Sequence, residues 1–348
     1  MSGQQIQYII KSCNGTHNSI ASIASHILKD KYVCAAPNGK LWYWFNGTLW
    51  IKDESNTNLH YDLSVTIRNY YLSTSPQDFN THTLTNLQKI SFVKTIVLEM
   101  REFMYDPKFA GKLDTDRNLI AFTNGVWELK EHAFREARAD DYLSISVGYD
   151  FTPVPNLEIT EKCKQFWGKI HVDAFQREYC INTFARQLYG DTGNLIHIHV
   201  GQYAGMFFGL LEVCLGQYMT EFNANRVTVK HKRSITDDFH NWIGCRILYC
   251  KPENNQILDQ DNIKELAVRG HVLYRLPRAN DIKVFNPMCQ LHVVCGEPPE
   301  HFEASSSRIQ MVDYISTEDD NVIFQLESDD YKMEFLRLLL DAYDTIIC

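Results

Sequence analysis

The sequence has 348 residues, which is enough for two or three domains with a sizeable hydrophobic core. Hydrophobic residues make up 45% of the chain, and the formal net charge is -9. This balance argues against a protein that coats nucleic acid with its whole surface, although it allows a local basic groove. The N-terminus has no basic stretch followed by a long apolar one, and the most apolar window, 195–219, contains two histidines and a glutamate. We therefore expect neither a secretory signal nor a membrane span.

The N-terminal part of the chain mixes helical and strand patterns. Apolar residues spaced by three to four predict helices at 19–28, 63–72 and 87–104. Apolar or aromatic runs interrupted by Asn-Gly predict strand–turn–strand units at 41–51 and 118–137. The aromatic residues of the first unit are either a platform for stacking bases or the core of their own small domain.

The C-terminal part begins after a proline-punctuated stretch near residue 155 and a helical pattern at 158–189. From residue 195 onward short apolar strands alternate with helices, which is typical of an α/β domain with a largely parallel sheet. The predicted strands are 195–200, 245–250, 290–295 and 308–315; the predicted helices are 206–216, 260–268 and 329–343; a basic loop is predicted at 226–236. We therefore expect an α+β N-terminal module at 1–155, a helical connector at 156–190 and an α/β domain at 191–348.

The segment after the strand at 195–200 has the layout of a phosphate-binding loop. A buried strand, a glycine-bearing turn and an apolar helix follow one another in "LIHIHVGQYAGMFFGLLEVCLG", and Gly201 and Gly205 are expected to keep the turn. Such a loop also needs a lysine for the terminal phosphates, followed by a serine or threonine for Mg²⁺. Met206 and Phe207 stand at these two positions, so the turn is present without its side-chain chemistry.

The order of several segments resembles the helicase half of the poxvirus-type primase-helicases of large DNA viruses, whose motor belongs to helicase superfamily three. The resembling pieces are "LWYWFNGTLWI", "FTNGVWELKEHAFREARADDYLSISVGYDF", "LGQY", "VKHKRSITDDFHNWIGCRILYCKPENN", "IKELAVRGHVLYRLPRANDIKVFNP", "QLHVVCGEPP" and "YKMEFLRLLLDAY". The resemblance covers nearly all of the chain and implies a P-loop-ATPase-like fold for residues 191–348. It includes no counterpart of the primase part of these proteins.

The resemblance also implies four chemical roles for which this chain carries other residues. The phosphate lysine is replaced by Met206, the metal-binding hydroxyl by Phe207, the acidic residue after the second strand by Lys251, and the γ-phosphate-sensing asparagine by Gly296. Gly201, Gly205 and Arg308 are what remains of the nucleotide site. We interpret the site as one that no longer holds or cleaves a nucleotide, and we expect no metal and no cofactor.

Three functions are compatible with this pattern. The first is a catalytically inactive paralogue of the viral motor that acts as a scaffold or partner subunit in a replication complex or particle. The second is a working helicase that uses ATP and Mg²⁺ through displaced residues such as Glu253. The third is a single-stranded nucleic-acid-binding module, because residues 226–278 contain ten lysines or arginines and six acidic residues. Its candidate contacts are Lys230, Lys232, Arg233, Arg269 and Arg275.

The resemblance further implies a set of partners and a location. Viral replication or virion proteins are the expected partners, single-stranded DNA is a candidate ligand, and a ring or another homo-oligomer is a candidate assembly. The expected location is the cytoplasm or nucleus of an infected host cell, or the virion, rather than the outside of the cell or a membrane.

Overall fold

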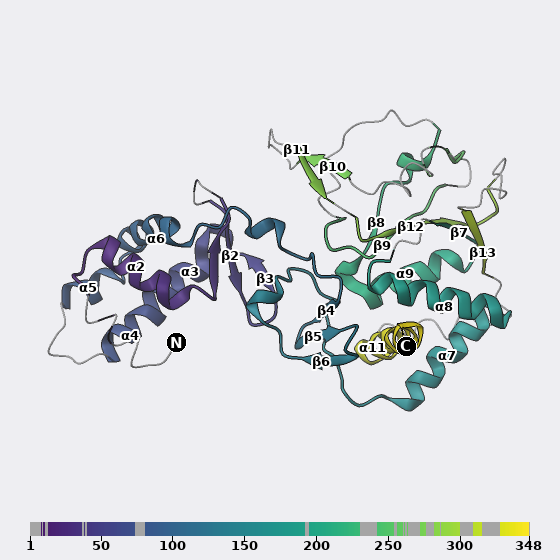
Figure 1. Cartoon of the computed structure of the whole chain (residues 1–348), viewed down its shortest axis with the longest axis horizontal. Helices are drawn as coiled ribbons and strands as arrows, with labels where there is room; N and C mark the ends of the chain where they lie inside the picture. The colour runs from purple at the N-terminus through teal and green to yellow at the C-terminus, as the bar shows by residue number, and fades with distance from the viewer. Residues whose placement is uncertain are drawn as a thin grey trace. The chain divides into compact units, whose positions relative to one another are not determined.

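The chain forms two compact units, one made of residues 1–113 and 138–144 and the other of residues 114–137 and 145–348 (Figure 1). The computed structural model describes residues 8, 10, 13–36, 38, 40–73, 81–191, 195–229, 242–253, 256–259, 261, 263, 272–275, 282–285, 287–299, 309–314 and 328–347. No helix among these residues is both long enough and apolar enough to cross a membrane.

Two helices packed against each other form much of the core of the N-terminal unit. Helix α2 (His17–Leu28) begins after Thr16, whose side chain accepts a hydrogen bond from the Ser19 amide. Its buried face packs on α6 (Ile90–Met104) in one hydrophobic core. Both helices confirm the predicted segments. The shorter helical segments of this unit are η1 (Glu54–Asn56), α3 (Thr57–Tyr61), the π-helical η2 (Asp62–Ile67), α4 (Arg68–Ser73), α5 (Thr81–Asn86), η4 (Phe109–Gly111) and η5 (Ala139–Asp141).

The aromatic residues of the N-terminal unit form a small sheet. Strands β1 (Tyr32–Cys34), β2 (Trp42–Phe45) and β3 (Trp50–Lys52) pair antiparallel in chain order. The turn between β2 and β3 is stabilised by the Asn46 side chain, which accepts hydrogen bonds from two backbone amides. Trp42, Tyr43 and Trp50 are buried, so these rings belong to the core of their own unit and are not an exposed stacking platform.

The C-terminal unit begins with a second three-stranded antiparallel sheet. Its strands are β4 (Leu119–Phe122), β5 (Gly125–Glu128) and β6 (Ala133–Arg135), which agrees with the predicted strand–turn–strand pattern. Phe122 and Trp127 of this sheet share one core with helices α7 (Leu157–Ile170) and α8 (Ala174–Leu188). The contacts therefore divide the chain near residue 113, whereas the sequence predicted a boundary near 155. The proline-rich stretch itself is exposed, but residues before and after it belong to one apolar core.

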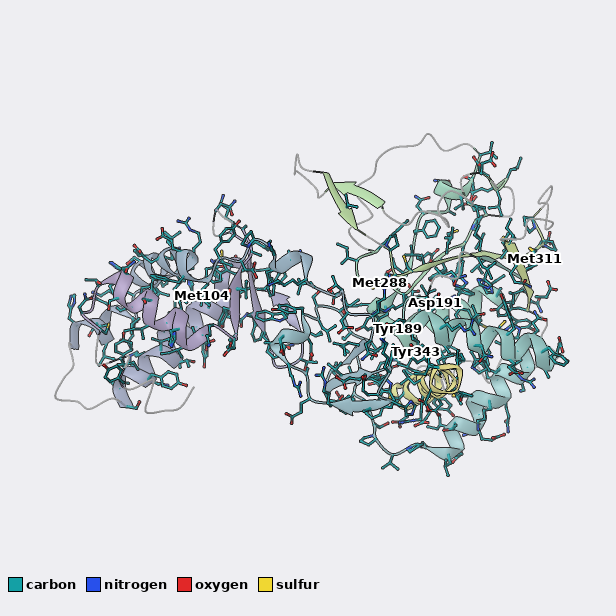
Figure 2. The ribbon with its side chains drawn as sticks, in the orientation of Figure 1. Met104, Tyr189, Asp191, Met288, Met311 and Tyr343 are labelled. Atoms are coloured by element: carbon teal, nitrogen blue, oxygen red, sulfur yellow. The ribbon has the colours of Figure 1, made fainter. Side chains whose placement is uncertain are left out.

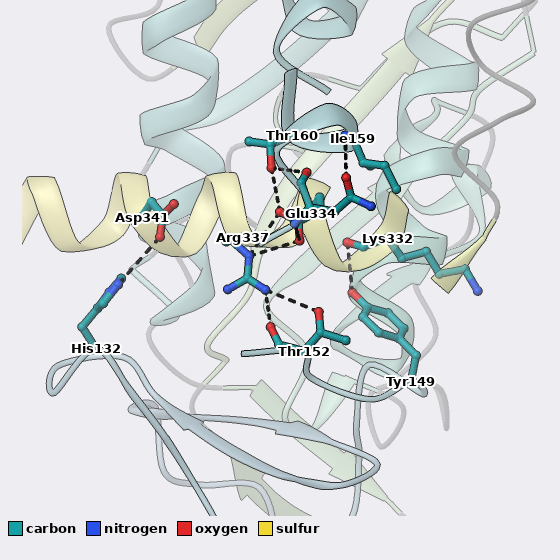
Figure 3. A network of polar contacts seen from close by, with 10 residues as sticks. His132, Tyr149, Thr152, Ile159, Thr160, Lys332, Glu334, Arg337 and Asp341 are labelled. Atoms are coloured by element: carbon teal, nitrogen blue, oxygen red, sulfur yellow. Dashed lines mark hydrogen bonds and ion pairs between the residues drawn. The ribbon is translucent and has the colours of Figure 1, made fainter. Parts of the chain in front are cut away.

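Helix α11 (Asp329–Ile347) packs against α7, α8 and α9 (Ala204–Leu215) on the helical side of this unit (Figure 1). Tyr343 of α11 stacks on Tyr189, the residue after α8, with ring centroids 6.0 Å apart (Figure 2). Close to the start of α11, the Glu334 carboxylate and the Arg337 guanidinium form a buried ion pair (Figure 3).

The main sheet has five strands, all of them parallel. They are β7 (Ile196–Val200), β8 (Met219–Glu221), β9 (Ile247–Cys250), β12 (Gln290–Cys295) and β13 (Ile309–Asp313), in the spatial order β13-β7-β12-β9-β8. The sequence predicted a largely parallel sheet, and this prediction is confirmed. Strand β8 was not predicted, because its three residues are too few to show an apolar strand pattern, whereas the other four strands were predicted at their observed positions. A separate hairpin, β10 (Val272–Arg275) with β11 (Ile282–Phe285), lies between β9 and β12 in the chain.

Both faces of the main sheet are covered, as continuously apolar parallel strands require. Helices α8 and α9 (Ala204–Leu215) pack on one face together with α11. Phe222, Trp242 and Leu258 pack on the other face. Short 3₁₀ turns η6 (Gly216–Tyr218) and η7 (Ala224–Val227) flank β8. This double-sided burial stabilises the domain independently of any ligand at the end of the sheet.

Candidate functional site

The carboxyl ends of the parallel strands bring several predicted site residues to one edge of the sheet. Gly201 follows β7, Lys251 follows β9 and Gly296 follows β12, and these three strands are neighbours in the order β7-β12-β9. After β7 the chain continues to β8 at the far edge of the sheet, whereas β13 pairs with the opposite edge of β7. In open α/β sheets ligands bind in the crevice beyond the strand ends at such a point of reversal. This edge is therefore the candidate site of the fold.

The turn after β7 is short and tightly packed. Only three residues separate Val200, the last residue of β7, from Ala204, the first residue of α9. The Gly201 amide donates a hydrogen bond to the Cys295 carbonyl at 3.1 Å, and the Gly201 carbonyl accepts one from Ala204. Gly201 has a φ of +124°, and a Cβ atom built on it would lie 2.4 Å from the Tyr314 carbonyl oxygen. Only glycine fits this position, because the neighbouring strand end occupies the space of a side chain.

The predicted loop residues after Gly201 lie in the first turn of a helix. Because α9 begins at Ala204, Gly205 is a helical residue, and its expected place in the turn was wrong. Met206 is half-buried, while Phe207 is fully buried. The Phe207 ring lies 5.0 Å from the Trp167 ring, measured between centroids, and points into the core between α7 and α8. The position expected for a metal-binding hydroxyl is therefore part of the packing of the helical layer.

Lys251 is exposed at the end of β9, and its ammonium lies 5.1 Å from the centre of the Tyr249 ring. The buried Tyr249 hydroxyl lies 2.7 Å from Glu212 Oε2 and 3.2 Å from Glu221 Oε2. Burial, and then the hydrogen bond to Glu212, raise the pKa of this phenol well above its usual range. Sequence reasoning missed this contact, although a tyrosine inside a buried strand indicates a partner for its hydroxyl. The described residues contain no cluster of three metal-ligating side chains.

The remaining predicted residues are spread over different parts of the chain. Gly296 is exposed directly after β12, and Glu253 is exposed in the loop after β9. The Arg275 backbone ends β10 and pairs with Ile282. Arg308, Lys230, Lys232, Arg233 and Arg269 lie outside the described residues.

A glycine turn after the first strand of a parallel, helix-covered sheet defines an α/β domain of the P-loop-like class. Residues 23–176 match the protein family described as "D5 N terminal like". A "Putative helicase" of Acanthamoeba polyphaga mimivirus is 27% identical over 203 residues, which are 52% of this chain and 21% of the relative. A "Putative helicase" of Frog virus 3 (isolate Goorha) is 21% identical over 194 residues, 40% of this chain and 20% of the relative.

The chain thus carries a D5 N-terminal-like region and is homologous to helicase-like proteins of large DNA viruses. It spans about a fifth of the length of these two relatives. A solved structure described as "The A form apo structure of NrS-1 C terminal region-CTR" aligns with 54% of this chain and 48% of its own, at 14% identity and a TM-score of 0.42.

Gly201 in the turn and Gly205 in the first turn of α9 are expected to respond oppositely to substitution by alanine. Gly201→Ala should lower the free energy of unfolding by at least about 1–3 kcal/mol, because its positive φ and the Tyr314 carbonyl both oppose a Cβ atom. Gly205→Ala should raise it by roughly 0.5–1 kcal/mol, since a Cβ there meets no atom within 4 Å and alanine favours the helix. Denaturant unfolding of the two variants measures both effects. Equal destabilisation by the two changes would contradict the helical position of Gly205.

Proposed function

We propose that this chain is a catalytically inactive relative of the viral primase-helicase motor and acts as a scaffold or partner subunit. Homology to viral helicase-like proteins gives it a primase-helicase-related role. The observation that carries the finer proposal is the three-residue turn between β7 and α9, with Phe207 buried in the core behind it.

A phosphate loop holds its ligand with several successive backbone amides that point toward the phosphates. Here the turn is too short to surround a phosphate chain, and the Gly201 amide is already bonded to Cys295. Met206 offers neither charge nor hydrogen bond where a lysine is needed. These features support loss of nucleotide binding more strongly than any single missing residue does.

The second strand end supports the same proposal. In a phosphoryl-transfer site an acidic residue at this position holds Mg²⁺ or orients the attacking water. Lys251 places a positive charge there instead, and this charge repels a divalent cation. Glu253 lies two residues later in an exposed loop, and it is the residue through which the displaced-site alternative has to act.

Nucleotide titration tests the proposal directly. We expect no saturable binding of ATP or ADP with Mg²⁺ up to about 1 mM in calorimetry, equivalent to a binding free energy weaker than roughly −4 kcal/mol. We also expect no ATP turnover above the rate of buffer alone. Micromolar affinity together with turnover that Glu253→Gln abolishes would overturn the proposal in favour of a helicase with displaced residues.

The partners that fit this proposal are other proteins of viral replication or of the virion, in an infected cell. A ring or another homo-oligomer is the assembly we propose, by analogy with the motors that the sequence resembles. Single-stranded DNA is the alternative ligand, and the basic composition of residues 226–278 supports it. The β10–β11 hairpin lies within and just after this basic stretch.

A further inference from the structure

A row of polar side chains crosses the buried helical face of the main sheet. Its members come from two neighbouring strands, from α8 and from the residue after β13, and all but one of them are almost fully buried. We call this row the histidine–glutamine chain; its residues are Tyr179, Gln187, His197, His199, Gln290, His292 and Tyr314.

A single backbone carbonyl fixes the proton positions in one half of the histidine–glutamine chain. Gln290 Nε2 lies 2.8 Å from the Leu195 carbonyl, which can only accept, so this atom must be the amide nitrogen. The same nitrogen lies 2.8 Å from His197 Nδ1, which therefore accepts. His197 then carries its proton on Nε2 and donates to the Tyr179 hydroxyl at 2.8 Å.

The proton positions in the other half of the histidine–glutamine chain follow from the same Leu195 carbonyl. Gln290 Oε1 accepts from Gln187 Nε2 at 2.9 Å, so Gln187 Oε1 faces His292 Nε2 at 3.0 Å. His292 Nε2 therefore donates, and His292 Nδ1 accepts from His199 Nε2 at 2.8 Å. His199 Nδ1 in turn accepts from the Tyr314 hydroxyl at 3.0 Å. Every donor in the histidine–glutamine chain points the same way, and the arrangement is complete only when all three histidines are neutral.

An additional proton on Nδ1 of His197 has no acceptor in this arrangement. It would place Nδ1–H against the Gln290 amide donors, and Leu195 prevents the amide from turning over. An additional proton on His292 would meet the Nε2–H of His199, unless His199 changes tautomer. The His197 and His292 rings lie 5.2 Å apart, so two protonated rings would also repel each other.

We propose that the histidine–glutamine chain is an acid-sensitive latch. At neutral pH it joins strands β7 and β12 to helix α8, and in mild acid its protonation opens this part of the C-terminal unit. The latch is independent of whether a nucleotide binds, because it lies within the core and not at the strand ends.

The surroundings offer no counter-charge to a protonated ring. The titratable groups that face the latch from the packed elements are His171 at the end of α7 and Cys180 on α8; Arg177 on α8 acts on His171. From α9 the neighbours are phenylalanines, with Phe208 4.6 Å from the His199 ring. No carboxylate contributes to the shifts of the three histidines of the chain.

The sign of the pH effect follows from burial. Desolvation lowers the pKa of His197 to about 4 and holds those of His199 and His292 well below the usual value. The unfolded chain takes up protons near pH 6.5, whereas the folded chain does not. The stabilisation is therefore complete above about pH 6.5 and decreases as the pH falls toward the lowered values, by up to tenfold in the unfolding constant per histidine and pH unit.

The experiment is denaturant unfolding of the whole chain between pH 7.5 and pH 4.5, combined with hydrogen exchange resolved to peptides. We expect peptides of β7, β12 and α8 to lose protection below about pH 6.5, after correction for intrinsic exchange, while peptides of α2 and α6 keep theirs. Unchanged protection of the sheet at pH 5 would overturn the proposal.

A matched pair of variants isolates the contribution of His197 to proton uptake on unfolding. His197→Asn keeps an acceptor for Gln290 but cannot be protonated, and Tyr179 is exposed enough to bond to water instead. It should take up about one proton fewer on unfolding near pH 5 than the wild type. His26→Asn, on the exposed face of α2, should leave proton uptake by the C-terminal unit unchanged. Equal uptake by His197→Asn and the wild type would contradict the latch.

Nitrogen-15 NMR of the wild-type histidine rings decides the question even if a variant fails to fold. At pH 7.5 we expect His197, His199 and His292 to be neutral with the proton on Nε2. A charged ring, or a proton on Nδ1 of His197, would overturn the donor order from which the proposal is derived.

Discussion

Replacing Glu334 with glutamine is expected to destabilise the C-terminal unit by about 3–5 kcal/mol, because the change leaves the buried Arg337 guanidinium without its anion. Only 2% of the Glu334 side chain and 10% of the Arg337 side chain are exposed. A loss of this size is a large fraction of the 5–15 kcal/mol that ordinarily separates folded from unfolded chains.

The pair also ties three separate segments together (Figure 3). Glu334 accepts hydrogen bonds from the Asn156 amide at 3.0 Å and from the Thr160 hydroxyl at 2.8 Å, both at the start of α7. Arg337 donates to the Thr152 carbonyl. Removing the carboxylate charge therefore weakens the attachment of α11 to α7 as well as the ion pair itself.

The control is an exposed ion pair within helix α7. Glu158 and Lys162 lie 2.7 Å apart, but 78% of the Glu158 side chain is exposed. Glu158→Gln should leave the free energy of unfolding nearly unchanged, because water screens this exposed pair. The double variant Glu334→Met with Arg337→Met should recover part of the loss, because neither charge is then left unpaired. Denaturant unfolding of the wild type and the three variants measures these effects, and similar losses for Glu334→Gln and Glu158→Gln would contradict this account.

The strands of the main sheet could be predicted because a strand that is buried on both faces has a short, continuously apolar sequence. The stretches "LIHIHV", "RILYC" and "LHVVC" are short, mainly apolar and separated by helices, and they form three neighbouring parallel strands. The extent of each compact unit could not be predicted in this way. Phe122 and Phe151 both precede the proline-rich boundary signal, yet they share one core with the helices that follow it.

The local shape of the candidate site was less predictable, because it depends on residues distant in sequence. Gly201 is required by the Tyr314 carbonyl, which lies more than a hundred positions later in the chain. The start of α9 at Ala204 differs from the predicted start at 206, since the expected loop was given the length that a phosphate needs. The packing of Phe207 against Trp167 explains why this shorter turn is stable.

The histidine–glutamine chain was missed for a similar reason. The alternation His197-x-His199 on one strand and Gln290-x-His292 on another places four polar side chains on one face of the sheet. This alternation is visible in the sequence, but both strands are apolar overall, so it did not indicate a polar network. Only the register, in which His292 lies opposite His197, brings the side chains together.

Restoring the two missing side chains of the phosphate loop separates the fold of this turn from its lost chemistry. Met206→Lys places a lysine on a half-buried position in the first turn of α9, where its ammonium can reach water. We expect a change of no more than about 1 kcal/mol in stability, part of it from the unfavourable position of a cation at a helix N-terminus.

Phe207→Ser should instead destabilise the C-terminal unit by at least about 3–5 kcal/mol, because it removes a fully buried ring and leaves a cavity. The rings of Trp167, Tyr314 and Phe184 all lie within 5.5 Å of the Phe207 ring, between centroids, and would lose this neighbour. Neither variant, nor the two combined, should gain ATP binding in calorimetry, since the three-residue turn still cannot surround the phosphates. If Met206→Lys alone conferred micromolar ATP affinity, the side chain and not the backbone would be the missing part, and the proposal of a structurally closed turn would be wrong.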